Sequence, residues 1–108
     1  MKLKVYQDEA TKTAIYSEGS KINYPILGLV GEAGELANKY KKVLRDDGGI
    51  LHPEKRKDMI KELGDVLWYV AALARDLGAD LDDVARENIE KLRDRQARGV
   101  IGGSGDNR

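Results

Sequence analysis

The stretch that decides the fold is Lys61–Ala74, KELGDVLWYVAALA. Its hydrophobic residues recur every three or four positions, which is the period of an α-helix. From Val66 onward it carries no charged residue on any face, as expected for a helix that is buried all round. It nevertheless begins with Glu62 and Asp65, two carboxylates three residues apart, on the side away from the apolar stripe. An unpaired carboxylate at the edge of a buried region is costly, so the pattern predicts a compensating partner.

The same helical period extends over most of the chain. Patterning and turn signals predict four helices, at about 5–17, 25–45, 53–77 and 81–98. We expect the apolar stripes of the second and third helices to form the core, and no segment alternates as a strand would. The sequence therefore predicts an all-α fold, a small antiparallel helical bundle of about four helices. Residues 1–99 form its single domain, and residues 100–108 form a glycine-rich C-terminal tail.

Composition excludes several classes of protein. The chain has 108 residues, of which 41% are hydrophobic and 35% charged, so it is globular but can bury only a modest core alone. This favours an oligomer. Lysines and arginines balance aspartates and glutamates, which argues against binding to nucleic acid or to a membrane surface. With no cysteine, no secretory leader pattern and no long apolar run, we expect a cytoplasmic protein without disulfides or thiolate metal sites.

Another acidic pair lies earlier in the chain, before Glu62 and Asp65. Glu32 and Glu35 are again three residues apart on a predicted helix. Taken alone, either pair fits a solvated helix face. Packed antiparallel, however, the two helices would bring four carboxylates together, and these could not all stay ionised without cations. Oxygen ligands favour Mg²⁺, with Mn²⁺ as the alternative. A di-iron bundle would need Glu-x-x-His pairs, and neither acidic pair contains a histidine.

Neighbouring residues suggest what else the site could bind. Gly28 and Gly31 share the acidic side of their helix, which indicates either tight helix packing or close approach of a ligand. Lys39 and Lys42 follow on the same side, as partners of Glu35 or as cations for a polyphosphate. The further candidates for substrate binding, each also open to a structural role, are Trp68 and its neighbour Tyr69 as stacking surfaces and Asn88, Lys91 and Arg95 as a basic stripe.

Together these features resemble the MazG-like family of all-α nucleoside triphosphate pyrophosphohydrolases. The resemblance rests on GLVGEAGEL, ELGDVLWYVAALA and NIEKLRDR, and 26 residues (36–61) separate the two acidic pairs. It implies hydrolysis of a (deoxy)nucleoside triphosphate to the monophosphate and pyrophosphate, with water attacking the α-phosphorus. By position, Glu32, Glu35, Glu62 and Asp65 would be the catalytic Mg²⁺ ligands. It also implies a homodimer or homotetramer, with sites near the subunit interface.

Other functions remain open at this point. Many family members carry a further glutamate where this chain has Gly31, so the general base could be Glu32, Glu35 or a metal-activated water. The tail raises the idea that Asp106 and Arg108 close over a ligand. Related phosphoribosyl-ATP pyrophosphohydrolases and dUTPases share this chemistry, and a non-catalytic metal-binding oligomerisation module is the alternative outside enzymes. The sequence does not indicate which nucleotide is preferred.

Overall fold

The computed structural model describes all 108 residues and contains no strand. Its elements are α1 (Leu3–Thr11), the short 3₁₀ helix η1 (Glu18–Ser20), α2 (Asn23–Asp46), α3 (Pro53–Asp76) and α4 (Leu81–Ala97). The prediction of an all-α protein with four helices is therefore confirmed. None of these helices combines the length and the apolar character needed to cross a membrane.

The first helix ends at Thr11, several residues before the predicted end near residue 17. The reason is tertiary. The Trp68 indole N–H donates to the Ala10 carbonyl at 3.1 Å, and the Arg75 guanidinium donates to the Thr11 carbonyl at 3.2 Å. These donors satisfy carbonyls at the end of the helix, so the chain can turn away there.

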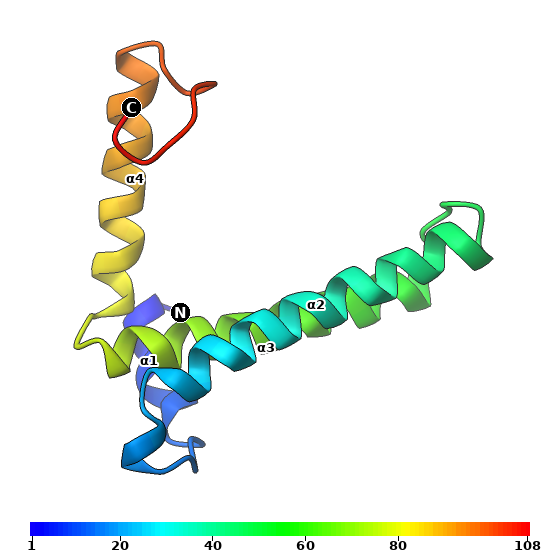
Figure 1. The fold of residues 1–108 in the computed structure, drawn as a ribbon, viewed down its shortest axis with the longest axis horizontal. Helices are drawn as coiled ribbons and strands as arrows, with labels where there is room; N and C mark the ends of the chain where they lie inside the picture. Colours follow the sequence, from blue (N-terminus) through cyan, green and yellow to red (C-terminus); the bar gives the residue numbers. More distant parts are fainter.

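Helices α2 and α3 form a long antiparallel hairpin (Figure 1). On each helix one set of less exposed residues recurs at alternating steps of three and four. They are Pro25, Leu29, Glu32, Leu36, Lys39 and Val43 on α2, and Met59, Glu62, Val66, Tyr69, Leu73 and Asp76 on α3. This spacing is the seam of two packed helices. We call these twelve residues the hairpin seam, and several of them are polar.

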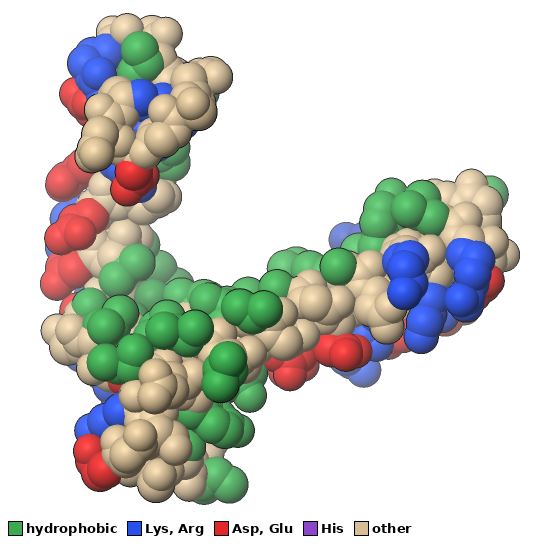
Figure 2. Space-filling view, viewed as in Figure 1, with side chains coloured by type: hydrophobic (Ala, Val, Ile, Leu, Met, Phe, Trp, Pro, Cys, Tyr) green, Lys and Arg blue, Asp and Glu red, His purple; other side chains and the backbone are tan.

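The predicted apolar stripes are only partly covered, which corrects the expectation that they form the core. Many of their residues are exposed: Ile26, Val30, Ala33, Ala37, Tyr40 and Leu44 on α2, and Ile60, Leu63, Leu67 and Leu77 on α3. Each lies one position beyond a seam residue. Because the helices are antiparallel, that shared offset turns both sets toward the same side of the hairpin. We call this side the apolar face, and Figure 2 shows it along the edge that looks toward α4.

Helix α4 projects away from the hairpin at its base, so the molecule is angular rather than a closed bundle (Figure 1). Buried Gln7 sets this direction. Its amide nitrogen donates to the carbonyls of Ala71 and Ala79, and its oxygen accepts from the Leu81 N–H at 3.0 Å. One side chain of α1 thereby connects the end of α3, the short link and the start of α4.

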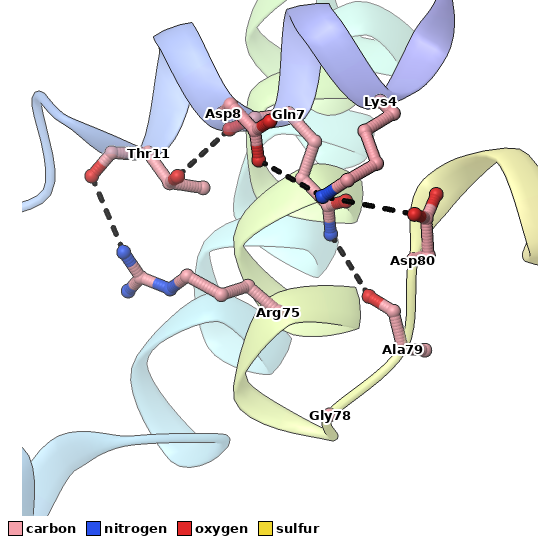
Figure 3. A pocket seen from close by; sticks show the side chains of 8 residues that line it. All are labelled: Lys4, Gln7, Asp8, Thr11, Arg75, Gly78, Ala79 and Asp80. Atoms are coloured by element: carbon pink, nitrogen blue, oxygen red, sulfur yellow. Dashed lines mark hydrogen bonds and ion pairs between the residues drawn. The ribbon is translucent and has the colours of Figure 1, made fainter.

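Residues of α1, α3 and the link to α4 line a hollow around Gln7, and charged side chains in it form ion pairs with one another (Figure 3). Lys4 lies 3.3 Å from Asp8 and 3.7 Å from Asp80. Nearby, Ala71, Ala74 and Leu81 form a small core. Only eight residues of the whole chain are buried, so most of the apolar surface of the helices is left without a partner.

A strained turn before α2 depends on Asp76. Ile22 has φ 68° and ψ −55°, and the Asn23 N–H donates to the Lys21 carbonyl at 2.7 Å, which together define a γ-turn that is costly for a β-branched residue. The fully buried Asp76 carboxylate accepts from the Ile22 N–H at 3.0 Å and from the Tyr16 hydroxyl at 2.8 Å. Burial alone would raise the pKa of Asp76, but these hydrogen bonds and Arg75 outweigh it and lower that pKa.

We expect Asp76→Asn to lower the free energy of unfolding by about 2 kcal/mol at neutral pH. The amide loses the charge that strengthens these hydrogen bonds, and it turns an NH2 group either toward the Arg75 guanidinium or toward the Ile22 and Tyr16 donors. Because the pKa of Asp76 is lowered in the folded state, its stabilisation is present above the ordinary aspartate pKa and is lost as pH falls through the folded value. Urea unfolding at fixed protein concentration, followed by circular dichroism across this acid range, measures both effects.

The exposed Asp58→Asn change is the matched control and should leave both quantities unchanged. Adding Ile22→Gly to Asp76→Asn should recover part of the loss, because glycine adopts positive φ without strain. Equal urea midpoints for Asp76→Asn and the parent chain would show that this contact does not hold the turn.

Candidate metal and nucleotide site

Three of the four predicted carboxylates meet at the middle of the hairpin. One oxygen each from Glu32, Glu62 and Asp65 lies within 4.8 Å of the others. Asp65 is exposed, as expected, but Glu62 is not. Its side chain is only 15% exposed and belongs to the hairpin seam, which corrects the prediction that it points away from the packed side. Its Oε2 atom is buried and has no hydrogen-bond partner.

The electrostatics of this acidic cluster are unbalanced. Interaction with Glu62, followed by desolvation and by repulsion from neighbouring carboxylates, raises the pKa of Glu32. One cation reaches the cluster: the Lys39 ammonium lies 3.8 Å from Glu62 Oε1. A single, distant ammonium leaves three converging carboxylates with excess negative charge and one oxygen orphaned. These donors fit a hard divalent cation, which takes oxygen ligands.

The other residues predicted near the acids take different places. Glu35 is exposed and lies outside the group of three carboxylates. Lys42 is also exposed, and it lies one residue before the seam residue Val43, on the acidic side of α2. At Gly28 a methyl group would fall 2.1 Å from a carbon of the Tyr69 ring, so the close approach there is by a side chain of α3. Gly31 faces open space beside Glu32.

Aromatic rings flank the acidic cluster. Trp68 and Tyr69 line a hollow of about 270 Å³ with Glu32 and Asp65. The two rings meet edge to face with centroids 5.0 Å apart. Trp68 also has a structural role, because its N–H is held by α1. Both rings are expected from the sequence as flat surfaces one helical turn from the acids, and both lie beside the acidic cluster.

The basic stripe of α4 lies elsewhere. Asn88 and Lys91 line a separate hollow of about 460 Å³ together with Asp106, and Arg95 is buried beneath the tail. Figure 2 shows acidic side chains along the hairpin edge opposite the apolar face, whereas α4 stands beyond the apolar side. Within one chain the structure therefore does not bring the stripe and the acidic cluster into one site.

Comparison with known proteins identifies the family. Residues 23–100 match the MazG nucleotide pyrophosphohydrolase domain, so the chain belongs to that family. This range holds all three clustered carboxylates and the basic stripe. The family is generally dependent on divalent metals, in keeping with the acidic cluster.

Two similar proteins have names that say little about activity. Gene 37 protein of Mycobacterium phage L5 is 50% identical over the full length of both chains. The uncharacterized protein YvdC of Bacillus subtilis (strain 168) is 35% identical over 69 residues, which cover 59% of this chain and 65% of YvdC. No solved structure gave a significant match.

We expect Mg²⁺ to raise the thermal stability of the protein, by about 2–3 kcal/mol at a hundredfold excess over its dissociation constant. Because the pKa of Glu32 is raised, repulsion within the cluster is present at neutral pH and is relieved as pH falls toward the ordinary glutamate pKa. The effect of Mg²⁺ should therefore shrink in that acidic range. Thermal unfolding with Mg²⁺ or EDTA at each pH measures it.

Glu62→Gln separates this explanation from general salt effects. It removes the orphaned charge, so the metal-free protein should become more stable by about 1 kcal/mol and lose its response to Mg²⁺. Glu90→Gln, on the exposed side of α4, is the matched control and should keep that response. An unchanged response in Glu62→Gln would mean that the cation binds elsewhere.

Proposed function

We propose that this protein hydrolyses a nucleoside or deoxynucleoside triphosphate to the monophosphate and pyrophosphate, in a reaction that depends on Mg²⁺ or, alternatively, Mn²⁺. Water would attack the α-phosphorus, and the bond from that atom to the oxygen bridging to the β-phosphate would break. The convergence of Glu32, Glu62 and Asp65, with one oxygen of Glu62 buried and unpaired, is the observation that supports this best.

The three clustered carboxylates would hold the metal. When bound, Mg²⁺ polarises phosphate oxygens and makes a coordinated water more acidic. The pKa of Glu32 is raised by its anionic neighbours, and a cation would relieve that repulsion, so Glu32 suits ligation better than proton transfer. Glu35 stands one turn away, outside the cluster and exposed. We assign it the role of accepting the proton of the attacking water, in a chain where Gly31 offers no carboxylate.

The remaining residues around the cluster would position the substrate. Lys39 already lies beside Glu62, and it could turn to phosphate oxygens once a cation takes its place. Lys42 would add positive charge on the acidic side of the hairpin. Trp68 and Tyr69 form the wall of the hollow, and an aromatic surface there can stack against a nucleobase.

A second copy of the chain would complete the site. The apolar face carries Val30 at 67% exposure and Leu63 at 54%, and such a face has its natural partner in another hairpin. Pairing two hairpins there would give a four-helix bundle. We propose a homodimer, or a homotetramer of such pairs, in which α4 of one copy brings Asn88, Lys91 and Arg95 to the phosphates held by another copy.

The decisive experiment is pyrophosphate release from a panel of canonical and modified nucleoside triphosphates, with Mg²⁺, Mn²⁺ or EDTA. We expect equimolar pyrophosphate and monophosphate in the presence of metal only. Glu62→Gln and Asp65→Asn should lower kcat about a hundredfold or more, because metal binding fails. Glu35→Gln should lower kcat as far while keeping the Mg²⁺ effect on stability, because it removes the base.

Glu9→Gln, on the exposed side of α1, is the control and should retain full activity. Release of inorganic phosphate alone, or full activity in Asp65→Asn, would contradict the proposal. A folded, metal-binding protein that is silent on every triphosphate would instead be a binding module, or would act on a phosphoribosyl nucleotide.

The oligomer is tested separately. Val30→Asp places a charge in the apolar face and should convert the assembly to monomers, as measured by sedimentation velocity. Lys12→Asp, at an exposed position just after α1, introduces the same side chain outside the hairpin and should leave the mass unchanged. A parent chain that sediments as a monomer at all concentrations would contradict this assembly.

A further inference from the structure

The tail is folded back onto α4 by defined contacts. Gly99 ends the helix with φ 71°, and Gly105, with φ 82°, turns the chain so that Asp106 returns to the basic stripe. The Arg108 guanidinium donates to the carbonyls of Val100 at 2.9 Å and Ile101 at 3.1 Å. These bonds tie the two ends of the segment together, so that residues 100–108 form a compact loop.

Asp106 is the part of this loop that meets the predicted substrate-binding residues. Its carboxylate Oδ1 accepts from the Lys91 ammonium at 2.8 Å and from the Arg95 guanidinium at 3.0 Å, and its backbone carbonyl accepts from Arg95 at 2.8 Å. The Arg95 side chain is only 6% exposed, whereas that of Asp106 is 79% exposed. The largely buried Arg95 guanidinium is thus paired with the Asp106 carboxylate, which is exposed enough to move away from it.

This arrangement is what a bound phosphate group would also provide. Two charged donors one turn apart surround acceptor oxygens, and phosphate oxygens can accept the same charge-assisted hydrogen bonds. Asp106 supplies one negative charge against two cations, so a polyphosphate would neutralise the pair more fully. Lys91, followed by Arg95, lowers the pKa of Asp106, which keeps this carboxylate ionised at neutral pH.

We propose that the tail is an autoinhibitory latch, in which Asp106 occupies the position of a substrate phosphate between Lys91 and Arg95 until a triphosphate displaces it. The proposal rests on the proposed function, because it assigns these cations to the phosphates of the substrate. The sequence raised the idea that Asp106 closes over a bound ligand. We propose instead that Asp106 moves away when the ligand binds, because its carboxylate and a phosphate compete for the same donors. A latch that is closed most of the time lowers the apparent affinity in proportion to the open fraction.

The test uses inorganic tripolyphosphate and the full-length protein in EDTA, so that neither metal binding nor turnover is needed. Asp106→Asn weakens the latch and should tighten tripolyphosphate binding roughly fivefold in calorimetry. Gly105→Ala keeps the Asp106 charge but strains the turn, and it should also tighten binding. Glu90→Gln removes one negative charge from α4, the helix that carries both cations, at an exposed side chain that makes no hydrogen bond to the tail, and should have little effect.

Displacement of the tail is observed directly with a single label. The chain has no cysteine, so Ser104→Cys carries a unique nitroxide on the exposed loop. Tripolyphosphate should increase the mobility of that label, and Lys91→Met should abolish the increase. Unchanged or weaker binding by Asp106→Asn, or a label that becomes less mobile on binding, would overturn the latch.

The latch and the proposed activity can fail independently. A label that is released by tripolyphosphate in a protein that yields no pyrophosphate would keep the latch and reject the enzyme. Metal-dependent pyrophosphate release with an immobile tail would do the reverse. In an active enzyme with a functioning latch, Asp106→Asn should lower KM and leave kcat nearly unchanged, because the chemistry takes place at the carboxylates of the hairpin.

Discussion

The structure depends on a charge placed inside a helix–helix seam. Glu62 occupies a position where a packed hairpin would ordinarily carry a leucine, and one of its oxygens has no partner. Glu32 faces it from α2, so the two longest helices meet across mutual repulsion as well as apolar contact. Such an arrangement costs stability unless a cation enters, because a buried carboxylate loses its hydration. If a cation binds there, as we propose, the seam couples the stability of the hairpin to the occupancy of that site.

Other contacts of the fold hold the hairpin and its neighbouring helices in place. Asp76 at one end of the hairpin holds the strained turn at Ile22, and Gln7 connects α1, α3 and α4 through three hydrogen bonds. Both are buried polar side chains that are fully engaged, in contrast to Glu62. Much of the remaining apolar surface faces outward on one side of the hairpin. A chain with so small an internal core would gain stability by burying that face, and we propose another copy of the chain as its partner.

Substrate phosphates and metal would thus be held by parts of the molecule that one chain keeps apart. The acidic cluster is rigidly placed on two helices, whereas the basic stripe stands on a helix that projects from the base and is covered by its own tail (Figure 1). Assembly would bring the two halves together, and the tail would decide when the cations are free. In this proposal the hairpin carries out the chemistry, its apolar face forms the contact between copies, and the tail on α4 controls access to the cations.

The sequence by itself determined the helices, the class of fold, the carboxylate pairs and the family, because helical periodicity and motif spacing are local properties of the chain. It could not determine which side of each wide apolar stripe would pack against the other helix of the hairpin. That choice placed Glu62 inside the seam, left Val30 exposed and set Glu35 apart, and it follows from how two particular helices pack. Nor could it place Tyr69 over Gly28, or Asp106 between Lys91 and Arg95, since these contacts join helix faces and turns whose relative positions only the tertiary structure decides.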